Sequence, residues 1–447
     1  MIRQNFNADW TVEKGDGNSR MNSFLGNTQT KTVHLPYDAM IHEARTPDTK
    51  NGAQTGFYPG GEYIFQKHFT APQAWQGKPV SLVFEGVYQT ALVYLNGWLL
   101  TRNVNGYAEF TVEAGPYLKY GADNLLKVIA DNSLEPNSRW YTGSGIYRPV
   151  RLLVGNKVYL PQDTVRITTR EVGEGFALLD VTAQVQSASA VTERVTLQQT
   201  ICREGTAVLT DRQNLLLQPG ESRTVSFRYC VDSPALWSQE NPNLYTSTMQ
   251  VLEGEEELDR EETSFGIRTL SIDASHGVRI NGQTVKLRGA CIHHDNGILG
   301  AATLPDAEER RIRQLKEAGF NAIRSSHHPA GRALLDACDR YGVLVMDELS
   351  DVWNVRKNPY DYALYFEQDW KPTIQKMVAK DYNHPSVILY CVGNEISEAG
   401  SESGAETNRR LCNTFRELDP TRYTTNALNG LCLLYTSPSP RDRSLSR

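Results

Sequence analysis

The chain has 447 residues, and its 46 Lys and Arg against 52 Asp and Glu give a formal net charge of −6. At about 150 residues per domain, this length predicts about three domains. Lys and Arg form no cluster before the last few residues, so the basic footprint of a nucleic-acid-binding protein is absent. No window approaches the roughly 18 apolar residues of a membrane helix, and residues 1–7 lack the apolar core of a signal peptide.

Seven cysteines are scattered along the chain without a C-x-x-C pair. Their odd number and their spacing argue against a disulfide framework or a zinc site. We therefore expect isolated buried thiols in a reducing compartment. This indicates a cytoplasmic protein, with neither a nucleic acid nor a membrane as its partner.

Short β-rich runs fill the chain up to about residue 285. The run at 91–95 leads directly into Asn96-Gly97, a pair that favours a two-residue hairpin because both turn positions need positive φ. Similar runs without helical periodicity lie at 81–84, 150–154, 178–185 and 196–201. This pattern is typical of β-sandwiches, and the length allows two, divided near residues 155–161.

Beyond a last expected hairpin at 278–285, apolar strands alternate with amphipathic helices. Asp306 is expected to cap the first helix, and Gly319 and Gly342 are expected to end the first two. The strands are expected at 286–292, 321–324, 343–346 and 387–392, with a further helix at about 405–417. Such alternation predicts a parallel sheet with right-handed crossovers.

Each expected strand ends in polar residues that are capable of chemistry. They are His293-His294-Asp295, Arg324 to His328, Asp347-Glu348 and Asn394-Glu395. Chemistry at the C-terminal ends of successive parallel strands is typical of a (β/α)8 TIM barrel, whereas a doubly wound sheet usually binds at one switch point. No Gly-rich phosphate loop follows any strand, which disfavours a nucleotide-binding fold.

The barrel is expected to be incomplete. A full barrel takes about 250 residues, and the part from 271 to 430 has room for four βα units and a fifth strand at 422–425. Residues 431–447 break the alternation abruptly, so we interpret them as a non-native tail.

The stretch from Asn383 to Glu395 places an amide and a carboxylate side by side at the mouth of an apolar strand. A carboxyl group in that position can act as a general acid towards a leaving-group oxygen. Asn394-Glu395 could equally cap the following helix, and the spacing alone leaves both interpretations open.

This stretch resembles the acid/base signature of glycoside hydrolase family 2, which contains retaining β-galactosidases, β-glucuronidases and β-mannosidases. Residues 321–329 with 339–342 are similar to the family's other signature, which usually has Tyr at the place of His328. Residues 347–353 with 357–361 resemble a subset of β-galactosidases. Similar segments at the front of the chain extend the resemblance to essentially everything before about residue 430; they are 60–63, 145–149 and 265–268.

The resemblance implies a jelly-roll sugar-binding domain at residues 1–156, an immunoglobulin-like β-sandwich at 157–270 and the first half of a TIM-barrel catalytic domain at 271–430. It makes Glu395 the catalytic acid/base. It makes Asn394 the partner of the sugar 2-hydroxyl, a contact that strengthens in the oxocarbenium-like transition state.

The same resemblance gives roles to other residues near the strand ends. His293 and His327 would line the pocket as neutral donors to sugar hydroxyls, and Trp353 could offer an apolar face to the ring. Arg324 would orient carboxylates from below, although a strand-end Arg is often only a member of a buried ion pair. His294 and His328 are expected to point away from the pocket, because neighbouring strand residues face opposite sides. Trp140 and Tyr141 are expected to pack at a domain junction rather than to bind sugar.

Two departures from the family pattern bear on the site. Tyr390-Cys391 stands where many members have Trp-Ser, which alters the packing beside Glu395. Asp351-Val352 replaces a Glu-containing segment that ligates magnesium in some large β-galactosidases, so we expect neither a metal site nor a cofactor.

We therefore expect a retaining exo-β-glycosidase that hydrolyses terminal β-galactosides, with a carbohydrate as its partner. A β-glucuronidase or β-mannosidase is the alternative within the family, and a non-catalytic carbohydrate-binding protein is the alternative outside this class. The nucleophile of a retaining enzyme lies about 5–5.5 Å from the acid/base. It would follow a late barrel strand outside this sequence, so the chain alone is expected to be inactive. The oligomeric state stays open, a homo-oligomer of the full-length protein included.

Overall fold

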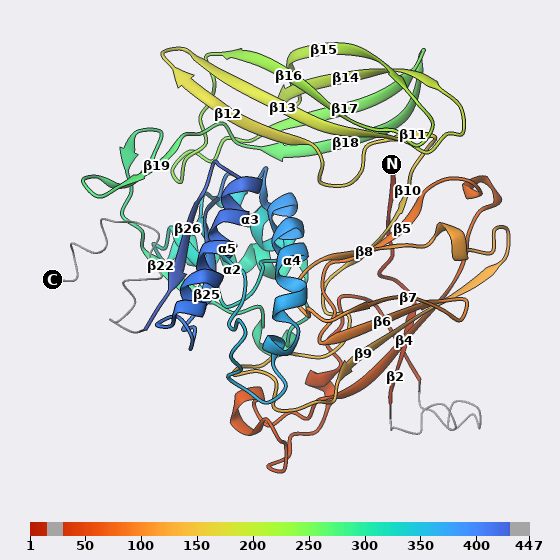
Figure 1. The fold of residues 1–447 in the computed structure, drawn as a ribbon, viewed down its shortest axis with the longest axis vertical. Helices are drawn as coiled ribbons and strands as arrows, with labels where there is room; N and C mark the ends of the chain where they lie inside the picture. Colours follow the sequence, from red (N-terminus) through yellow and green to blue (C-terminus); the bar gives the residue numbers. More distant parts are fainter. Residues whose placement is uncertain (16–29, 430–447) are drawn as a thin grey trace.

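The computed structural model describes residues 1–15 and 30–429. Figure 1 shows a β-sandwich on the right, a second β-sandwich across the top, and a parallel sheet with helices on the left. Among the described residues, no helix is long and apolar enough to cross a membrane. The expected tail at 431–447 lies outside the described residues.

The first domain is an expected β-sandwich. One sheet has the strand order β3-β2-β4-β9-β6-β7, and it packs against another with the order β1-β10-β5-β8. The expected Asn96-Gly97 turn is confirmed, since it joins β6 to β7 and both residues have positive φ. The strands are β1 Ile2–Asn5, β2 Trp10–Lys14, β3 Lys31–Val33, β4 Gly61–Thr70, β5 Val80–Phe84, β6 Thr90–Leu95, β7 Trp98–Asn103, β8 Phe110–Glu113, β9 Asp123–Asn132 and β10 Val150–Val154. Short 3-10 helices are η1 Met40–His42, η2 Gly52–Thr55, η3 Gln73–Trp75 and η4 Gly115–Tyr117.

The second domain is the other expected β-sandwich. One sheet has the order β11-β13-β12, with β16 beside β13, and the facing sheet has the order β15-β14-β17-β18. Alternate residues of β13 are buried, which places Leu179 and Val181 in a core shared with Leu197 and Val251 of the facing sheet. The strands are β11 Val158–Tyr159, β12 Arg166–Gly173, β13 Phe176–Ser187, β14 Glu193–Arg203, β15 Thr206–Leu217, β16 Ser222–Asp232, β17 Tyr245–Glu253 and β18 Glu256–Phe265.

The third domain contains the expected parallel sheet, with the order β22-β23-β24-β25-β26. Every neighbouring pair in this order is parallel, and helices connect the strands. A small antiparallel sheet precedes it; its strands are β19 Leu270–Asp273, β20 Gly277–Ile280 and β21 Gln283–Thr284. The remaining elements are β22 Gly289–Ile292, η5 Gly297–Leu299, α2 Pro305–Glu317, β23 Ala322–Ser325, α3 Arg332–Tyr341, β24 Leu344–Glu348, η6 Tyr362–Leu364, α4 Phe366–Asp381, β25 Val387–Asn394, α5 Glu402–Leu418 and β26 Tyr423–Ala427.

Two details of the helices and cysteines differ from expectation. Asp306 is not the cap of α2: Leu304 occupies that position and Pro305 begins the helix, because the fixed φ of proline suits the first turn. The described cysteines are free thiols in this structure, and Cys230 and Cys291 are exposed rather than buried.

Arg332 of α3 joins all three domains at one point. Its Nε and Nη2 each donate to Glu109 of the first domain at 2.8 Å, and its Nη1 donates to Asp163 of the second at 3.0 Å. Burial opposes the charged form of Asp163, but Arg332 outweighs it and lowers the pKa of this carboxyl to about 2. Since breaking such a buried pair leaves an uncompensated charge, the cluster fixes the domains against one another.

Candidate active site

The C-terminal ends of the parallel strands bring the expected polar residues together. Arg324 lies in β23, Glu348 ends β24 and Asn394 ends β25, while His293 follows β22 directly. Parallel pairing brings these ends to the same edge of the sheet, so residues far apart in the sequence become neighbours. Glu395 comes one residue after β25, at the same mouth.

Arg324 is the centre of a partly buried hydrogen-bond network. Its Nε and Nη2 donate to both carboxylate oxygens of Glu348, at 2.6 and 2.9 Å, and Nη2 also donates to Asn394 Oδ1 at 2.8 Å. The Glu348 side chain is fully buried. Burial opposes the charged guanidinium, but Glu348 outweighs it and raises the pKa of Arg324. Arg324 is therefore paired with the carboxylate of Glu348, which fits both the orienting role and the ion-pair interpretation.

Asp351 forms a second charged cluster at the mouth. Arg139 donates to it through Nε at 3.1 Å and Nη2 at 2.6 Å, and Lys357 Nζ donates to it at 2.9 Å. Asn394 Nδ2 donates to the same carboxylate at 2.8 Å. Burial by itself would raise the pKa of Asp351, but these donors outweigh burial and lower that pKa. Asp351 is therefore a carboxylate that holds Asn394 in place.

Glu395 differs from the other carboxylates because its side chain is 43 % exposed. Its backbone has φ of 45°, in the left-handed region that is uncommon for residues other than glycine. Its N–H donates to Ala427 O in β26 at 2.7 Å, which holds this conformation. The helix-cap interpretation of Asn394-Glu395 is wrong, because α5 begins at Glu402 and its cap is Ser401.

Two of the expected site histidines pack around one tryptophan. The rings of His293, His327 and Trp140 have centroids 5.1 to 5.3 Å apart. Burial, and then His327, lowers the pKa of His293, which favours the expected neutral form. His327 Nδ1 lies 2.7 Å from Glu348 Oε1 and 3.3 Å from Arg324 Nη2, and the shorter contact to the carboxylate favours the tautomer with the hydrogen on Nδ1. A neutral His327 would therefore accept a hydrogen bond from a sugar at Nε2 rather than donate one.

The expectation for Trp353 is not met in this structure. Its side chain is fully buried and Nε1 donates to Val392 O at 2.9 Å, so no ring face is open to a sugar. Trp140, expected only to pack at the domain junction, is partly exposed and reaches the histidines of the site. His294 and His328 are buried; His328, expected to point away, stacks on Tyr107 of the first domain and lines the pocket at the domain junction.

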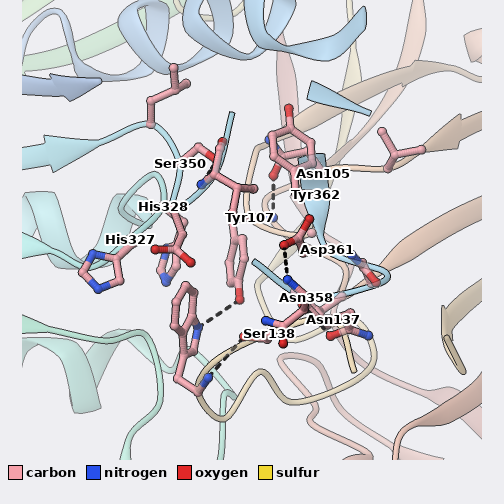
Figure 2. Close-up of a pocket in the computed structure, with 18 residues that line it drawn as sticks. Asn105, Tyr107, Asn137, Ser138, His327, His328, Ser350, Asn358, Asp361 and Tyr362 are labelled. Atoms are coloured by element: carbon pink, nitrogen blue, oxygen red, sulfur yellow. Dashed lines mark hydrogen bonds between the residues drawn. The ribbon is translucent and has the colours of Figure 1, made fainter. Parts of the chain in front are cut away.

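A pocket lies where the first domain meets the barrel. Figure 2 shows His327 and His328 on one side of it, with Asn358 and Asp361 on the other and Tyr107 between them. Asp361 accepts hydrogen bonds from the backbone of Lys357 and Asn358, at 2.7 Å each, and so fixes the loop that carries Lys357. The barrel mouth is thus built partly from the first domain.

Sequence reasoning missed several residues of the site. Glu348, Asp351 and Lys357 lie in segments that it singled out, but it gave them no role. Arg139 received no role because it comes from a different domain. The one available signal was its position beside Trp140, ahead of the motif at 145–149.

A group of possible metal ligands lies at the opposite end of the strands. Asp336, Asp339 and His384 offer ligand atoms within 4.8 Å of one another. His384 Nδ1 already lies 2.6 Å from Asp339, whose other oxygen accepts from Ser386 N at 3.0 Å. We therefore interpret this group as a structural contact between α3 and the start of β25.

Family models match the chain in the order of its domains. The glycosyl hydrolase 2 galactose-binding domain-like model matches residues 10–162, and the glycosyl hydrolases family 2 model matches 158–268. The glycosyl hydrolases family 2 TIM barrel domain model matches residues 273–435. The chain belongs to glycoside hydrolase family 2. The resemblance is confirmed, and so is the fold of two β-sandwiches followed by a partial TIM barrel.

Individual relatives carry different activities in their names. Beta-galactosidase BoGH2A of Bacteroides ovatus is 37 % identical over 91 % of this chain and 48 % of its own length. A beta-glucuronidase of Bacteroides fragilis is 27 % identical over 90 % of this chain and 58 % of its own. The crystal structure of a family 2 member from Bacteroides cellulosilyticus superposes with a TM-score of 0.93, at 36 % identity over 98 % of this chain and 57 % of that one. The chain thus spans about half the length of the curated relatives that it matches.

Proposed function

We propose that the full-length protein is a retaining exo-β-glycosidase that releases terminal β-galactosyl residues, with Glu395 as its general acid and base. The observation that carries this proposal is the exposure and hydrogen bonding of the Glu395 side chain. Its side chain is 43 % exposed at a strand mouth, and among the described residues only Oε2 has a hydrogen-bond partner. A general acid needs this access, because it must come within hydrogen-bond distance of the leaving-group oxygen.

In this reaction Glu395 first gives a proton to the departing oxygen, while a nucleophile outside the described residues attacks the sugar. Glu395 then takes a proton from the water that hydrolyses the glycosyl-enzyme. Asn394 would bond the sugar 2-hydroxyl through one hydrogen of Nδ2, since the other is donated to Asp351. Trp140, His293 and His327 would surround the ring.

A neutral sugar fits the charges of this mouth better than a glucuronide does. Arg139 and Lys357 both pair with Asp351, and Arg324 pairs with Glu348. Recognition of a glucuronate carboxylate requires a cation that can donate to it. These three described cations already donate to carboxylates of the protein, so we rank a β-galactoside above a β-glucuronide.

The full-length protein should therefore release nitrophenol from nitrophenyl β-galactoside much faster than from the β-glucuronide or the β-mannoside. Replacing the acid, in Glu395→Gln, should lower kcat/KM for a galactoside with a poor leaving group by about 10²–10⁴-fold. Failure to hydrolyse any of the three glycosides would overturn the proposal. Saturable binding of galactose-containing oligosaccharides by residues 1–270, measured by calorimetry, would then favour the non-catalytic alternative.

We further propose that the 447-residue chain is inactive by itself. A retaining enzyme needs a second carboxylate about 5–5.5 Å from the acid/base. The other described carboxylates at this mouth, Glu348, Asp351 and Asp361, are buried or nearly so, and they already bond to cations or backbone amides. Assay of residues 1–447 beside their Glu395→Gln variant tests this, since any turnover above the variant would contradict it.

A further inference from the structure

Arg139 connects the first domain to the acid/base of the barrel. It lies between β9 and β10, and its guanidinium reaches across the domain junction to two carboxylates. Nε and Nη2 donate to the two oxygens of Asp351, at 3.1 and 2.6 Å. The third nitrogen, Nη1, donates to Glu395 Oε2 at 3.1 Å.

The partner that anchors Arg139 is itself held rigidly. The Asp351 side chain is 12 % exposed and accepts from Lys357 Nζ and Asn394 Nδ2 as well. A two-pronged contact with such a carboxylate fixes the plane of the guanidinium. The position of Nη1, and with it the hydrogen bond to Glu395 Oε2, is therefore fixed by the contact between Arg139 of the first domain and Asp351 of the barrel.

We propose that Arg139 is a positioning residue for Glu395, so that the first domain completes the catalytic site of the barrel. This inference rests on the proposed function of Glu395. Because Nη1–H donates to Oε2, that oxygen acts as an acceptor, and the exchangeable proton is carried by Oε1. Among the described residues Oε1 has no hydrogen-bond partner, so it is the oxygen that faces a leaving group.

The proton balance of the step follows from this arrangement. As the bond between the sugar C1 and the leaving-group oxygen breaks, its electron pair goes to that oxygen, which receives the proton from Oε1. The nucleophile of the proposed function supplies the new bond to C1. Glu395 is left as a carboxylate, and the Arg139 N–H on Oε2 stabilises the charge where it develops.

A purely structural role for Arg139 makes a different prediction. Loosened domain contacts would lower turnover of every substrate alike. Loss of acid positioning would instead slow only substrates whose leaving group needs a proton. An alkoxide needs one, whereas a dinitrophenolate departs without it. The dependence on the leaving group therefore separates the two roles.

The test compares methyl β-galactoside with dinitrophenyl β-galactoside on the full-length protein. For Arg139→Met, we expect kcat/KM to fall about 10- to 100-fold with the methyl glycoside and less than about threefold with the dinitrophenyl glycoside. Arg139→Lys should recover part of the loss, since one ammonium cannot reproduce both contacts. The matched control is Arg102→Met, because Arg102 contacts Tyr365 of the barrel outside the site, and both substrates should be unaffected.

Each outcome decides the inference. Equal losses with both substrates, or no loss with the methyl glycoside, would overturn the role of Arg139 and leave the proposed function standing. A wild-type protein that hydrolyses neither glycoside would overturn the proposed function, and the role of Arg139 with it.

Discussion

At the scale of single residues, the carboxylates of the barrel mouth fall into two kinds. Glu348 and Asp351 are 0 and 12 % exposed, and each accepts a two-pronged contact from an arginine. Such two-pronged contacts hold the carboxylate and its neighbours in place. Glu395 is 43 % exposed and, among the described residues, is bonded through one side-chain oxygen, which leaves the other oxygen open to a ligand.

The Arg324 network supports a stability prediction. Arg324→Met should lower the free energy of unfolding by about 3 kcal/mol, because Glu348 would remain as a buried charge without its cation. Thermal unfolding followed by tryptophan fluorescence measures this. The control is Arg313→Met on the exposed side of α2, whose ion pair with Glu317 is 3.9 Å long and should change stability by less than about 1 kcal/mol. Equal effects of the two substitutions would contradict the role given to Arg324.

The sequence predicted the chemistry of the site better than its contacts. Glu395, Asn394, His293, His327 and Arg324 do meet at one edge of the sheet, since parallel strands require it. Burial and hydrogen-bond direction could not be predicted, because they depend on residues from other segments. Two tryptophans show this. Trp353 was expected in the site but packs beneath β25, whereas Trp140 was expected only to pack but reaches the site from a different domain.

At the scale of elements, the end of β25 is tightly packed at Gly393. A Cβ on Gly393 would lie 2.7 Å from Ile396 Cγ1 and 2.9 Å from Trp353 Nε1. Gly393→Ala should therefore displace Trp353 or the turn that carries Glu395, and lower the free energy of unfolding by about 1–3 kcal/mol. Chemical denaturation measures this loss.

The matched control is Gly115→Ala, where the nearest atoms would be 3.6 Å away, an ordinary contact. Gly393→Ala should also lower glycosidase turnover in the full-length protein, whereas Gly115→Ala should not. A Gly393→Ala protein as stable and as active as the wild type would show that β25 tolerates repacking.

Element types were predicted more reliably than element ends. The alternation of apolar strands with amphipathic helices predicted the parallel sheet, and Gly342 ends α3 in the left-handed conformation as expected. The start of α2 was missed because Pro305 competes with Asp306 for the first turn. The start of α5 is three residues earlier than expected, since the Ser401 hydroxyl accepts from Gly404 N and caps the helix there.

At the scale of the whole molecule, two buried histidines lie between the first domain and the barrel. His294 Nε2 lies 2.8 Å from Thr142 O, and because a carbonyl accepts, this nitrogen carries the hydrogen. His294 Nδ1 then accepts from His328 Nε2 at 3.1 Å. Burial lowers the pKa of His294 from 6.5 to about 3, and it lowers the pKa of His328 as well.

These histidines predict acid sensitivity of the domain junction. Between pH 6.5 and 3 the unfolded chain binds a proton at His294 that the folded chain does not, so the free energy of unfolding falls as the pH falls. At pH 5 the loss from His294 alone is about 2 kcal/mol relative to pH 7. Unfolding temperatures at the two pH values measure it. His294→Gln, which can still donate to Thr142, should reduce the difference, and the exposed His276→Gln should not; equal differences in all three proteins would contradict this account.

The order of the three domains was predictable from the sequence, but the contacts between the domains were not. Composition and periodicity separate the β-rich part from the alternating part. No sequence pattern in the loop at 133–149 indicates that this loop reaches the barrel. Contacts such as those of Arg139 and Arg332 pair charges that are far apart in the chain, and only the packed structure brings them together.

At the same scale, Glu395 is proposed as the acid/base of a retaining glycosidase, and chemical rescue tests this role most directly. In the full-length Glu395→Ala protein, dinitrophenyl β-galactoside should still form the glycosyl-enzyme, because its leaving group needs no proton. Water would then react slowly without a general base, whereas azide needs none. Added azide should raise turnover at least about tenfold and yield β-galactosyl azide, with no comparable effect on the wild type. Absence of rescue, or an α-configured azide, would contradict the account.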